Sequence, residues 1–257
     1  DAALTGLRMK IGDRLASTSW ANFGPQAGAS WNPKMLGEKI VFRGGFGIGY
    51  NVQQLATLSN GRSNPPWITS LTLTGANILY ATPDDPKQFS NWPVNPAAVQ
   101  TFDATSGLPV GGAAVNLNGF PEEQNTPVTY RYSFDTQYNF AKDWVATLGY
   151  SGSQTRNYSR QRNLSITNYP NLNPRVNRLF WFSNDAAAHY NAMQAQLQRH
   201  FSSTFTFDVQ YRLSRNTDQG SQDYYTDHYP FDISYSDGPS DFDVTHDFKT
   251  WAVWTPK

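Results

Sequence analysis

Residues 128–154 decide the fold. They read VTYRYSFDTQYNF over 128–140, AKD over 141–143 and WVATLGYSGSQ over 144–154. On both sides of the AKD turn, apolar and polar residues alternate, as in Tyr130, Tyr132 and Phe134 against Arg131 and Ser133. Because successive side chains of a strand point to opposite faces, the pattern predicts a hairpin with one apolar and one polar face. Both strands exceed the about five or six residues usual in soluble sheets and match the about nine to eleven that a tilted strand needs to cross a bilayer.

The composition excludes several classes of protein. Basic and acidic residues number twenty each, so nothing calls for a polyanionic partner such as nucleic acid. There is no cysteine, which excludes disulfides and thiolate metal sites. No run of about eighteen apolar residues predicts a transmembrane helix. A barrel strand is only half apolar, so a mean hydropathy of −0.58 suits both a barrel with a polar lumen and a soluble β protein.

Five further segments show the alternation of a strand. Segment 190–201 contains good helix formers, but its strict alternation favours a strand. The facing of the last segment stays open because Trp251 and Trp254 fall on opposite parities. With the hairpin these segments predict about seven strands, the five being 23–32, 39–50, 190–201, 204–214 and 247–255.

The connections between the predicted strands alternate in length. Short turns at 33–38, 141–143 and 202–203 alternate with long polar stretches at 51–127, 155–187 and 215–245. An up-and-down barrel in an outer membrane has short periplasmic turns and long extracellular loops. We therefore predict an all-β fold, an antiparallel up-and-down transmembrane β-barrel present as a partial barrel. Residues 1–257 would be one segment of a longer barrel domain, and the run 68–73 could add a strand within the first long loop.

Charged residues in mid-strand indicate which face is turned inward. Arg131 and Arg212 lie on the polar parity, and an arginine facing lipid at mid-membrane costs about 2–4 kcal/mol. The polar parity should therefore line the lumen. There its side chains either pair across strands, at about 0.2–1 kcal/mol a pair, or contact a plug or a passing substrate. The candidate lumen-lining residues are Arg43, Arg131, Asp135, Gln194, Gln196, Gln198, Asp208 and Arg212.

The predicted loops carry aromatic residues that could contact a ligand or simply pack. Candidates for ligand contact are Trp67, Trp92, Tyr224 and Tyr225. The acidic segment 237–243 could offer carboxylates to calcium, or be a solvated loop.

No motif predicts catalysis, a cofactor site or a metal site. The four histidines lack metal-ligand spacing, the segment GYSGS (149–153) lacks the last glycine of a nucleophile elbow, and GGFGIG (44–49) departs from the dinucleotide-binding pattern. The protein is therefore expected not to be an enzyme.

A series of motifs recurs in order along the chain. NFGPQAG (22–28) is followed by VFRGGFGI (41–48), then by YSF (132–134), LGYSGS (148–153) and Arg156. YNAMQ (190–194) continues to RHF (199–201), and YRLSR (211–215) and DVTHDF (243–248) follow. In this order they resemble the motifs of Oar-like TonB-dependent receptors. Gln26 stands where that family has an arginine, and YRLSR lacks the family's Trp and Lys.

The resemblance implies a function and partners. It implies an outer-membrane receptor of a Gram-negative bacterium, in which a plug domain and a TonB-type energy transducer, both outside this chain, gate transport of an unidentified substrate. Outer-membrane lipid would surround the barrel. Two alternatives stay open: a surface adhesin or structural barrel without transport, and a soluble carbohydrate-binding β module.

Overall fold

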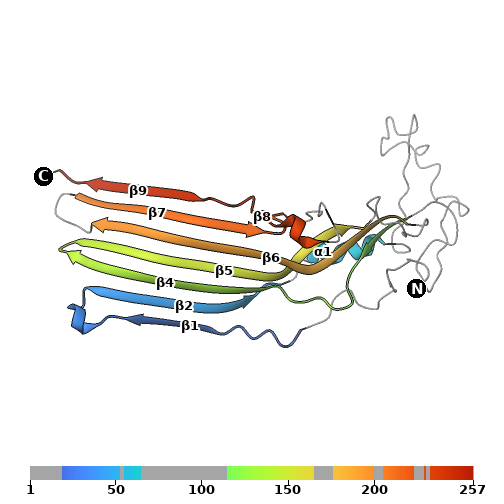
Figure 1. Ribbon diagram of the computed structural model, residues 1–257, viewed down its shortest axis with the longest axis horizontal. Helices are drawn as coiled ribbons and strands as arrows, with labels where there is room; N and C mark the ends of the chain where they lie inside the picture. Colours follow the sequence, from blue (N-terminus) through green and yellow to red (C-terminus); the bar gives the residue numbers. More distant parts are fainter. Residues whose placement is uncertain are drawn as a thin grey trace, which may run out of the picture. The chain divides into compact units, whose positions relative to one another are not determined.

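The computed structural model describes residues 19–52, 55–64, 115–164, 176–199, 205–222, 229 and 232–256. Its main feature is a mostly antiparallel sheet (Figure 1). The principal strands are β1 (Gln26–Trp31), β2 (Ile40–Tyr50), β4 (Val128–Ala141), β5 (Trp144–Asn163), β6 (Val176–Arg199), β7 (Phe205–Asp218) and β9 (His246–Trp254). All seven predicted strands are thus present, and the all-β prediction is confirmed.

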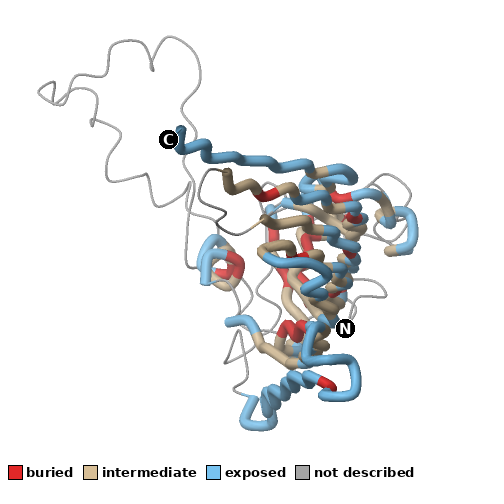
Figure 2. Tube along the Cα trace, turned by 90° about the vertical axis from the view of Figure 1, so that its left-hand side faces the viewer, coloured by how far each residue is buried: buried red, intermediate tan, exposed pale blue. Residues whose placement is uncertain are grey.

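The strands pair in the order β1-β2-β4-β5-β6-β7. The far edge of β7 pairs with β9 along 205–213 and with the short strand β8 (Gly238–Pro239) at 217–218. The turns between β1 and β2 and between β4 and β5, the end of β6 and the start of β7 all lie at the same end of this sheet (Figure 1). Strand β9 is exposed over nearly its whole length (Figure 2).

Two short turns require backbone that few side chains adopt. The turn between β1 and β2 contains the 3-10 helix η1 (Lys34–Leu36), and Gly37 and Glu38 follow it with φ of 67° and 57°. In the turn between β4 and β5, Asp143 has φ of 66°. Asp tolerates the left-handed region better than most residues, which explains why the AKD sequence closes this hairpin.

The predicted long loops were partly wrong. Strand β5 continues to Asn163 and β6 begins at Val176, so only 164–175 remain of the predicted loop 155–187. Residues 155–163 (TRNYSRQRN) are polar on both faces, so the sequence shows no alternation that would predict a strand there. Strand β7 likewise extends to Asp218.

The other two predicted loops also contain regular structure. Strand β3 (Val115–Gly119), helix α1 (Leu55–Ser59) and the 3-10 helix η2 (Asn60–Ser63) lie in 51–127. Strand β8 and the 3-10 helix η6 (Ile233–Ser236) lie in 215–245. The run 68–73 lies outside the described residues.

The chain divides into two compact units. The smaller one comprises residues 1–17, 54–122 and 162–182, and its described part has a core of its own. Leu179 is fully buried there, Leu117 and Leu164 are nearly so, and the rings of Phe120 and Phe182 stack at 5.3 Å. Strand β3 pairs in parallel with residues 176–181 of β6.

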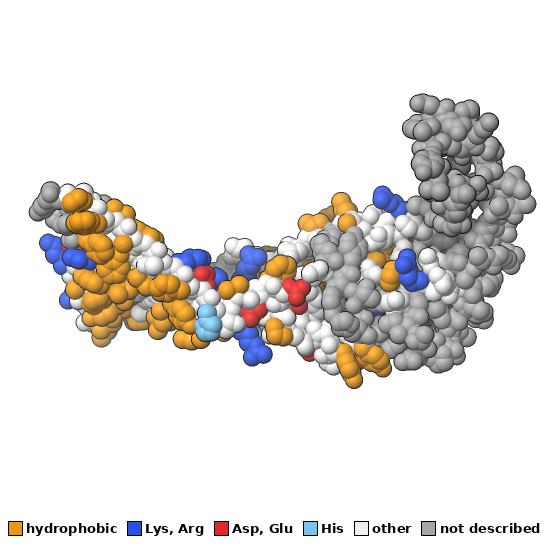
Figure 3. All heavy atoms as spheres, turned by 90° about the horizontal axis from the view of Figure 1, so that it is seen from above, with side chains coloured by type: hydrophobic (Ala, Val, Ile, Leu, Met, Phe, Trp, Pro, Cys, Tyr) orange, Lys and Arg blue, Asp and Glu red, His pale blue; other side chains and the backbone are white. Residues whose placement is uncertain are grey.

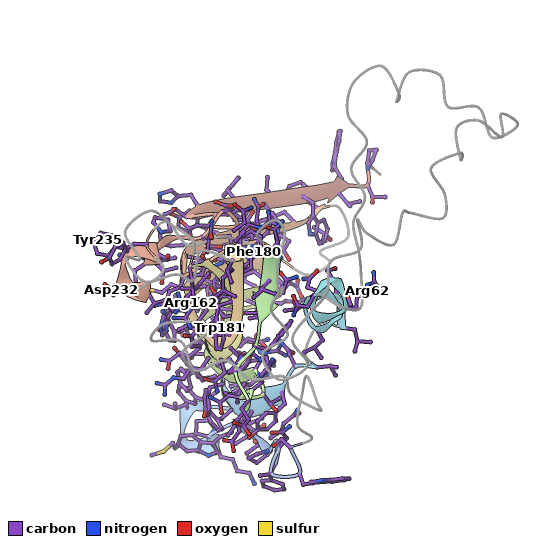
Figure 4. The ribbon with its side chains drawn as sticks, turned by 90° about the vertical axis from the view of Figure 1, so that its right-hand side faces the viewer. Arg62, Arg162, Phe180, Trp181, Asp232 and Tyr235 are labelled. Atoms are coloured by element: carbon purple, nitrogen blue, oxygen red, sulfur yellow. The ribbon has the colours of Figure 1, made fainter. Side chains whose placement is uncertain are left out.

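Polar and cationic contacts complete the smaller unit. The Asn64 side-chain amide bonds the backbone of Asn118, and Arg178 lies 4.4 Å above the ring of Phe180. Arg162, Phe180 and Trp181 belong to the same unit and are labelled in Figure 4.

The larger unit is the sheet of 18–53, 123–161 and 183–257, and its two faces differ sharply. Cross-strand register places Phe46 beside Tyr132, Phe134 beside Tyr150 and Met193 beside Leu213 on one face. On this face Phe134 is 54%, Leu148 57% and Met193 52% exposed. Such a contiguous apolar surface marks an interaction with a partner or a membrane.

The pairing of β7 with β9 resolves the facing of the last strand. Trp254 lies beside Phe205 on the apolar face, whereas Trp251 lies beside Asp208 on the polar face. In the part of the chain that the structure describes, no helix is long and apolar enough to cross a membrane.

Candidate functional site: the polar face of the sheet

All eight candidate lumen residues lie on one face of the larger unit, the polar face. Arg43 is directly opposite Asp135, Gln194 opposite Arg212, and Gln198 opposite Asp208. The side chains of the other parity lie together on the apolar face. There Tyr150 of β5 bonds Asn191 of β6, and Trp144 of β5 contacts Phe207 of β7. The strand parities inferred from the sequence therefore agree across the sheet.

The first group on the polar face is an ion pair between β2 and β4. The Arg43 guanidinium donates to Asp135 Oδ1 at 3.3 Å and to Gln137 Oε1 at 2.8 Å. The two charged side chains are 48% and 33% exposed, so water weakens their attraction. This pair is a cross-strand contact of the wall.

The second group surrounds Asp208 on β7. Asp208 is only 3% exposed, and its Oδ2 accepts hydrogen bonds from Gln196 at 2.8 Å and Gln198 at 2.6 Å. Its Oδ1 is buried without a hydrogen-bond partner among the described residues. The carboxylate is thus fixed by two amides of β6, its neighbour in the sheet.

The third group links β7 to β9. Arg212 donates to Asp247 Oδ2 at 2.9 Å, and Lys249 Nζ lies 3.0 Å from the same oxygen. Sequence reasoning did not select Asp247 and Lys249, although they share a parity in the last strand. The alternation that would have indicated them was obscured, because the apolar Trp251 and Val253 follow at the same parity of the strand.

Arg131 and Gln194 differ from the other candidates. Neither has a hydrogen bond, and Arg131 has no ion pair, among the residues that the structure describes. Arg131 is exposed and lies beside a hollow of about 660 Å³ on the sheet. The side chains around it include Ser133, Ser151 and Ser153.

Glycines form the floor of this hollow. The polar-face positions of β1 and β2 that line it are Gly28, Gly45, Gly47, Gly49 and Gln26, whose side chain lies against Gly47. A Cβ built on Gly49 meets nothing within 4 Å, so the absence of side chains leaves open space above the sheet. The strand glycines thus coincide with a depression beside Arg131.

The opposite, apolar face carries a belt of aromatic rings at the end with the short turns. Phe140 and Trp144 lie 5.9 Å apart, and Trp144 meets Phe207 edge-on at 5.4 Å. Arg199 lies 5.6 Å above the Trp144 ring. Hydrophobic side chains gather over this end of the sheet (Figure 3). Aromatic rings with snorkelling arginines are typical of the level where hydrocarbon meets headgroups.

The loop candidates receive no further support. Trp67, Trp92, Tyr224 and Tyr225 lie outside the described residues. In the acidic segment 237–243 the carboxylates bond the protein itself: Asp243 accepts from the Asn216 N–H, and Asp237 accepts from the Gln219 amide. Among the described residues no group of three or more His, Cys, Asp or Glu side chains could bind a metal.

One loop carboxylate has a shifted pKa. The Ser234 hydroxyl, followed by the Ser234 N–H, donates to Asp232 at 2.7 Å and 2.9 Å, and these bonds lower the pKa of this exposed carboxyl. Asp232 precedes η6 and is labelled in Figure 4.

The sheet has strands long enough to cross a bilayer at a tilt, one exposed apolar face with an aromatic belt, and one charged face. These are the features of the wall of an outer-membrane β-barrel. The comparison with protein families agrees. The model of the outer membrane beta barrel domain matches residues 2–257, and the chain belongs to this family. The protein is therefore located in the outer membrane, as predicted.

Two solved structures of outer-membrane proteins are similar to part of this chain. The outer membrane transporter YddB from Escherichia coli is 9% identical, with a TM-score of 0.47 over 76% of this chain and 20% of that one. The siderophore receptor PirA from Pseudomonas aeruginosa is 15% identical, with a TM-score of 0.40 over 76% of this chain and 28% of that one. This chain thus spans less than a third of either. No curated protein matches.

Proposed function

We propose that this chain is part of the barrel wall of an Oar-like, plug-gated TonB-dependent transporter. In this proposal the polar face lines the lumen, and the short turns face the periplasm. A plug domain outside this chain lies against the polar face until an energy transducer displaces it. The substrate then passes along the polar wall, and no covalent chemistry takes place.

The observation that supports this proposal best is the hollow beside Arg131. In a structural wall through which no solute passes, mid-strand cations would be expected to pair with carboxylates of the same wall. Arg43 pairs in this way with Asp135, and Arg212 with Asp247. Among the residues that the structure describes, Arg131 has no partner and lies beside an open glycine floor, which suits contact with a separate plug or solute. The ordered motifs of the Oar-like family support the same function.

A surface adhesin or structural barrel is the alternative. It shares the apolar face and the aromatic belt but needs no plug. Membership of the outer-membrane family disagrees with the third candidate, a soluble carbohydrate-binding module.

Cysteine labelling in the full-length protein distinguishes the two membrane functions. This chain has no cysteine, so Ser133→Cys reports on the hollow once any cysteine elsewhere in the full-length protein is replaced by serine. Tyr235→Cys, 71% exposed in η6, is the matched control. We expect a membrane-impermeant maleimide to label Ser133→Cys at least about tenfold more slowly than the control, and deletion of the plug to abolish the difference. Equal labelling rates with the plug present would contradict a plugged lumen and favour the adhesin.

A further inference from the structure

The apolar face ends in a row of polar side chains on the side away from the short turns. We call Tyr132, Tyr150, Asn191, Arg215 and His246 the rim row. Asn191 pairs directly with Arg215, and His246 pairs with Leu213, two residues before Arg215 on the same face. These side chains therefore lie across neighbouring strands at nearly one level.

Two tyrosine hydroxyls determine how the Asn191 amide is turned. Tyr132 and Tyr150 both donate to Asn191 Oδ1, at 3.0 Å and 2.6 Å. The amide nitrogen must then point away from both hydroxyls. Among the described residues it has no hydrogen-bond partner, so it presents two free donors on an exposed side chain.

Arg215 adds a charge beside these donors. It is exposed, and no carboxylate pairs with it in the part of the chain that the structure describes. Directly opposed residues in a sheet have Cβ atoms about 4.5–5.5 Å apart, so the guanidinium and the Asn191 amide can reach one ligand. The guanidinium fork matches the geometry of phosphate oxygens.

The level of the rim row corresponds to that of lipid headgroups. Phe205 and Arg215 are ten residues apart on one face of β7, about 33 Å along the strand. With the tilt of about 35–45° usual in such barrels, this is a height of about 25 Å, which equals the apolar band of an outer-membrane barrel. The intervening outward residues of β7, from Phe207 to Leu213, are apolar or aromatic.

A groove on the apolar face lies next to the rim row. It has a volume of about 580 Å³, and its outward-facing lining includes Ala146, Leu148, Ala195, Leu197 and Tyr211. Ala195 is four residues from Asn191 on the same face of β6, about 13 Å along the strand. Tyr211 also shares a 2.7 Å hydrogen bond with His246 of the rim row. An acyl chain in this groove would place its headgroup beside Asn191 and Arg215.

We propose that the rim row and this groove together bind a phosphorylated lipid of the outer leaflet. The Asn191 amide and the Arg215 guanidinium donate to the phosphate, and the alanine-lined groove takes an acyl chain. The leaflet follows from the proposed orientation, in which the short turns face the periplasm. Lipid binding itself does not depend on transport, so it can fail or succeed separately from the proposed function.

Native mass spectrometry of the detergent-purified full-length protein tests the proposal. The probes are bisphosphorylated lipid A and its dephosphorylated form. We expect the wild type to retain the phosphorylated lipid preferentially, and Arg215→Gln to bind it about tenfold more weakly. Asn191→Asp should weaken binding as well, because its carboxylate would pair with Arg215 and repel the phosphate.

The matched control is Arg131→Gln, which removes an equally unpaired arginine from the polar face and should leave lipid retention unchanged. Heat-modified gel mobility verifies that each variant has folded, and Arg215→Lys, which keeps a cation, should retain part of the preference. The proposal is wrong if the wild type does not distinguish the two lipids. It is also wrong if folded Arg215→Gln binds phosphorylated lipid as the wild type does.

Discussion

Gly152 is the residue whose identity the packing specifies most tightly. It lies opposite Tyr132, and a Cβ at this position would stand 2.5–2.7 Å from the tyrosine ring and hydroxyl. The ring lies over the glycine backbone, an arrangement that protects a glycine within a strand. The hydroxyl can then reach Asn191.

Substituting Gly152 by alanine should displace this ring. We expect Gly152→Ala to lower the free energy of unfolding by about 1–3 kcal/mol, as overpacking does, and to break the bond between Tyr132 and Asn191. Urea-induced unfolding of the full-length protein in lipid vesicles measures the change. Gly49→Ala is the control, because a Cβ there meets nothing within 4 Å; if both variants lose equal stability, the packing argument fails.

Two ion pairs of the sheet illustrate how burial changes the value of a contact. Arg160 and Asp185 form two hydrogen bonds of 2.6 Å and 3.0 Å; the Arg160 side chain is only 5% exposed, whereas that of Asp185 is 45% exposed. The pair of Arg43 and Asp135 is longer and half exposed. Asp185→Ala should therefore destabilise by about 3 kcal/mol, and Asp135→Ala by less than about 1 kcal/mol.

The same vesicle unfolding experiment measures both losses, and 1 M salt should reduce only the smaller one, since screening acts on exposed pairs. Equal losses would mean that the burial of Arg160 does not govern the strength of its contact.

Among the elements, β4 shows that neighbouring residues face different solvents. Phe134 lies on the apolar face between Gly44 and Tyr150, whereas Ser133 lies on the polar face between Gly45 and Ser151. The two strand faces were predictable from alternation within the strand, because parity is a property of the local backbone. The partners across the sheet depend on register with strands far away in the sequence.

Substituting arginine at these two neighbours should give opposite results. Phe134→Arg places a cation in lipid and should cost about 2–4 kcal/mol near mid-membrane. Ser133→Arg adds a cation to the polar face and should change stability by less than about 1 kcal/mol. Folding yield into vesicles and the unfolding free energy measure both. A larger loss at Ser133 would reverse the assignment of the two faces.

In the whole molecule, the last strand shows what pairing adds to sequence. Trp251 and Trp254 left the facing of 247–255 undetermined, and only the register with β7 assigns Trp254 to the apolar face. Ala252 shares that face with Trp254, opposite Phe207, and Val253 lies opposite Thr206 on the polar face.

Cysteines on β9 test this assignment in the complete barrel. In full-length protein without its plug, Val253→Cys should react with a water-soluble maleimide, and Ala252→Cys should react at least about tenfold more slowly because lipid excludes the reagent. A hydrophobic maleimide should label both variants. Faster water-soluble labelling at Ala252→Cys would place the apolar face of β9 in water.

The amino-acid sequence was sufficient for the seven long strands, their two faces and the short turns, because alternation, strand length and turn residues are local properties of the chain. It was insufficient for the continuation of β5 beyond the apolar band, where polar residues on both faces leave no alternation to read. It was also insufficient for the start of β6, where Leu179, Phe180, Trp181 and Phe182 form an apolar run without alternation. It also could not reveal the partners of Asp208 and Arg212, the glycine-floored hollow or the rim row. These features require side chains from separate strands to be placed at one level, and that placement depends on the cross-strand register of the folded sheet.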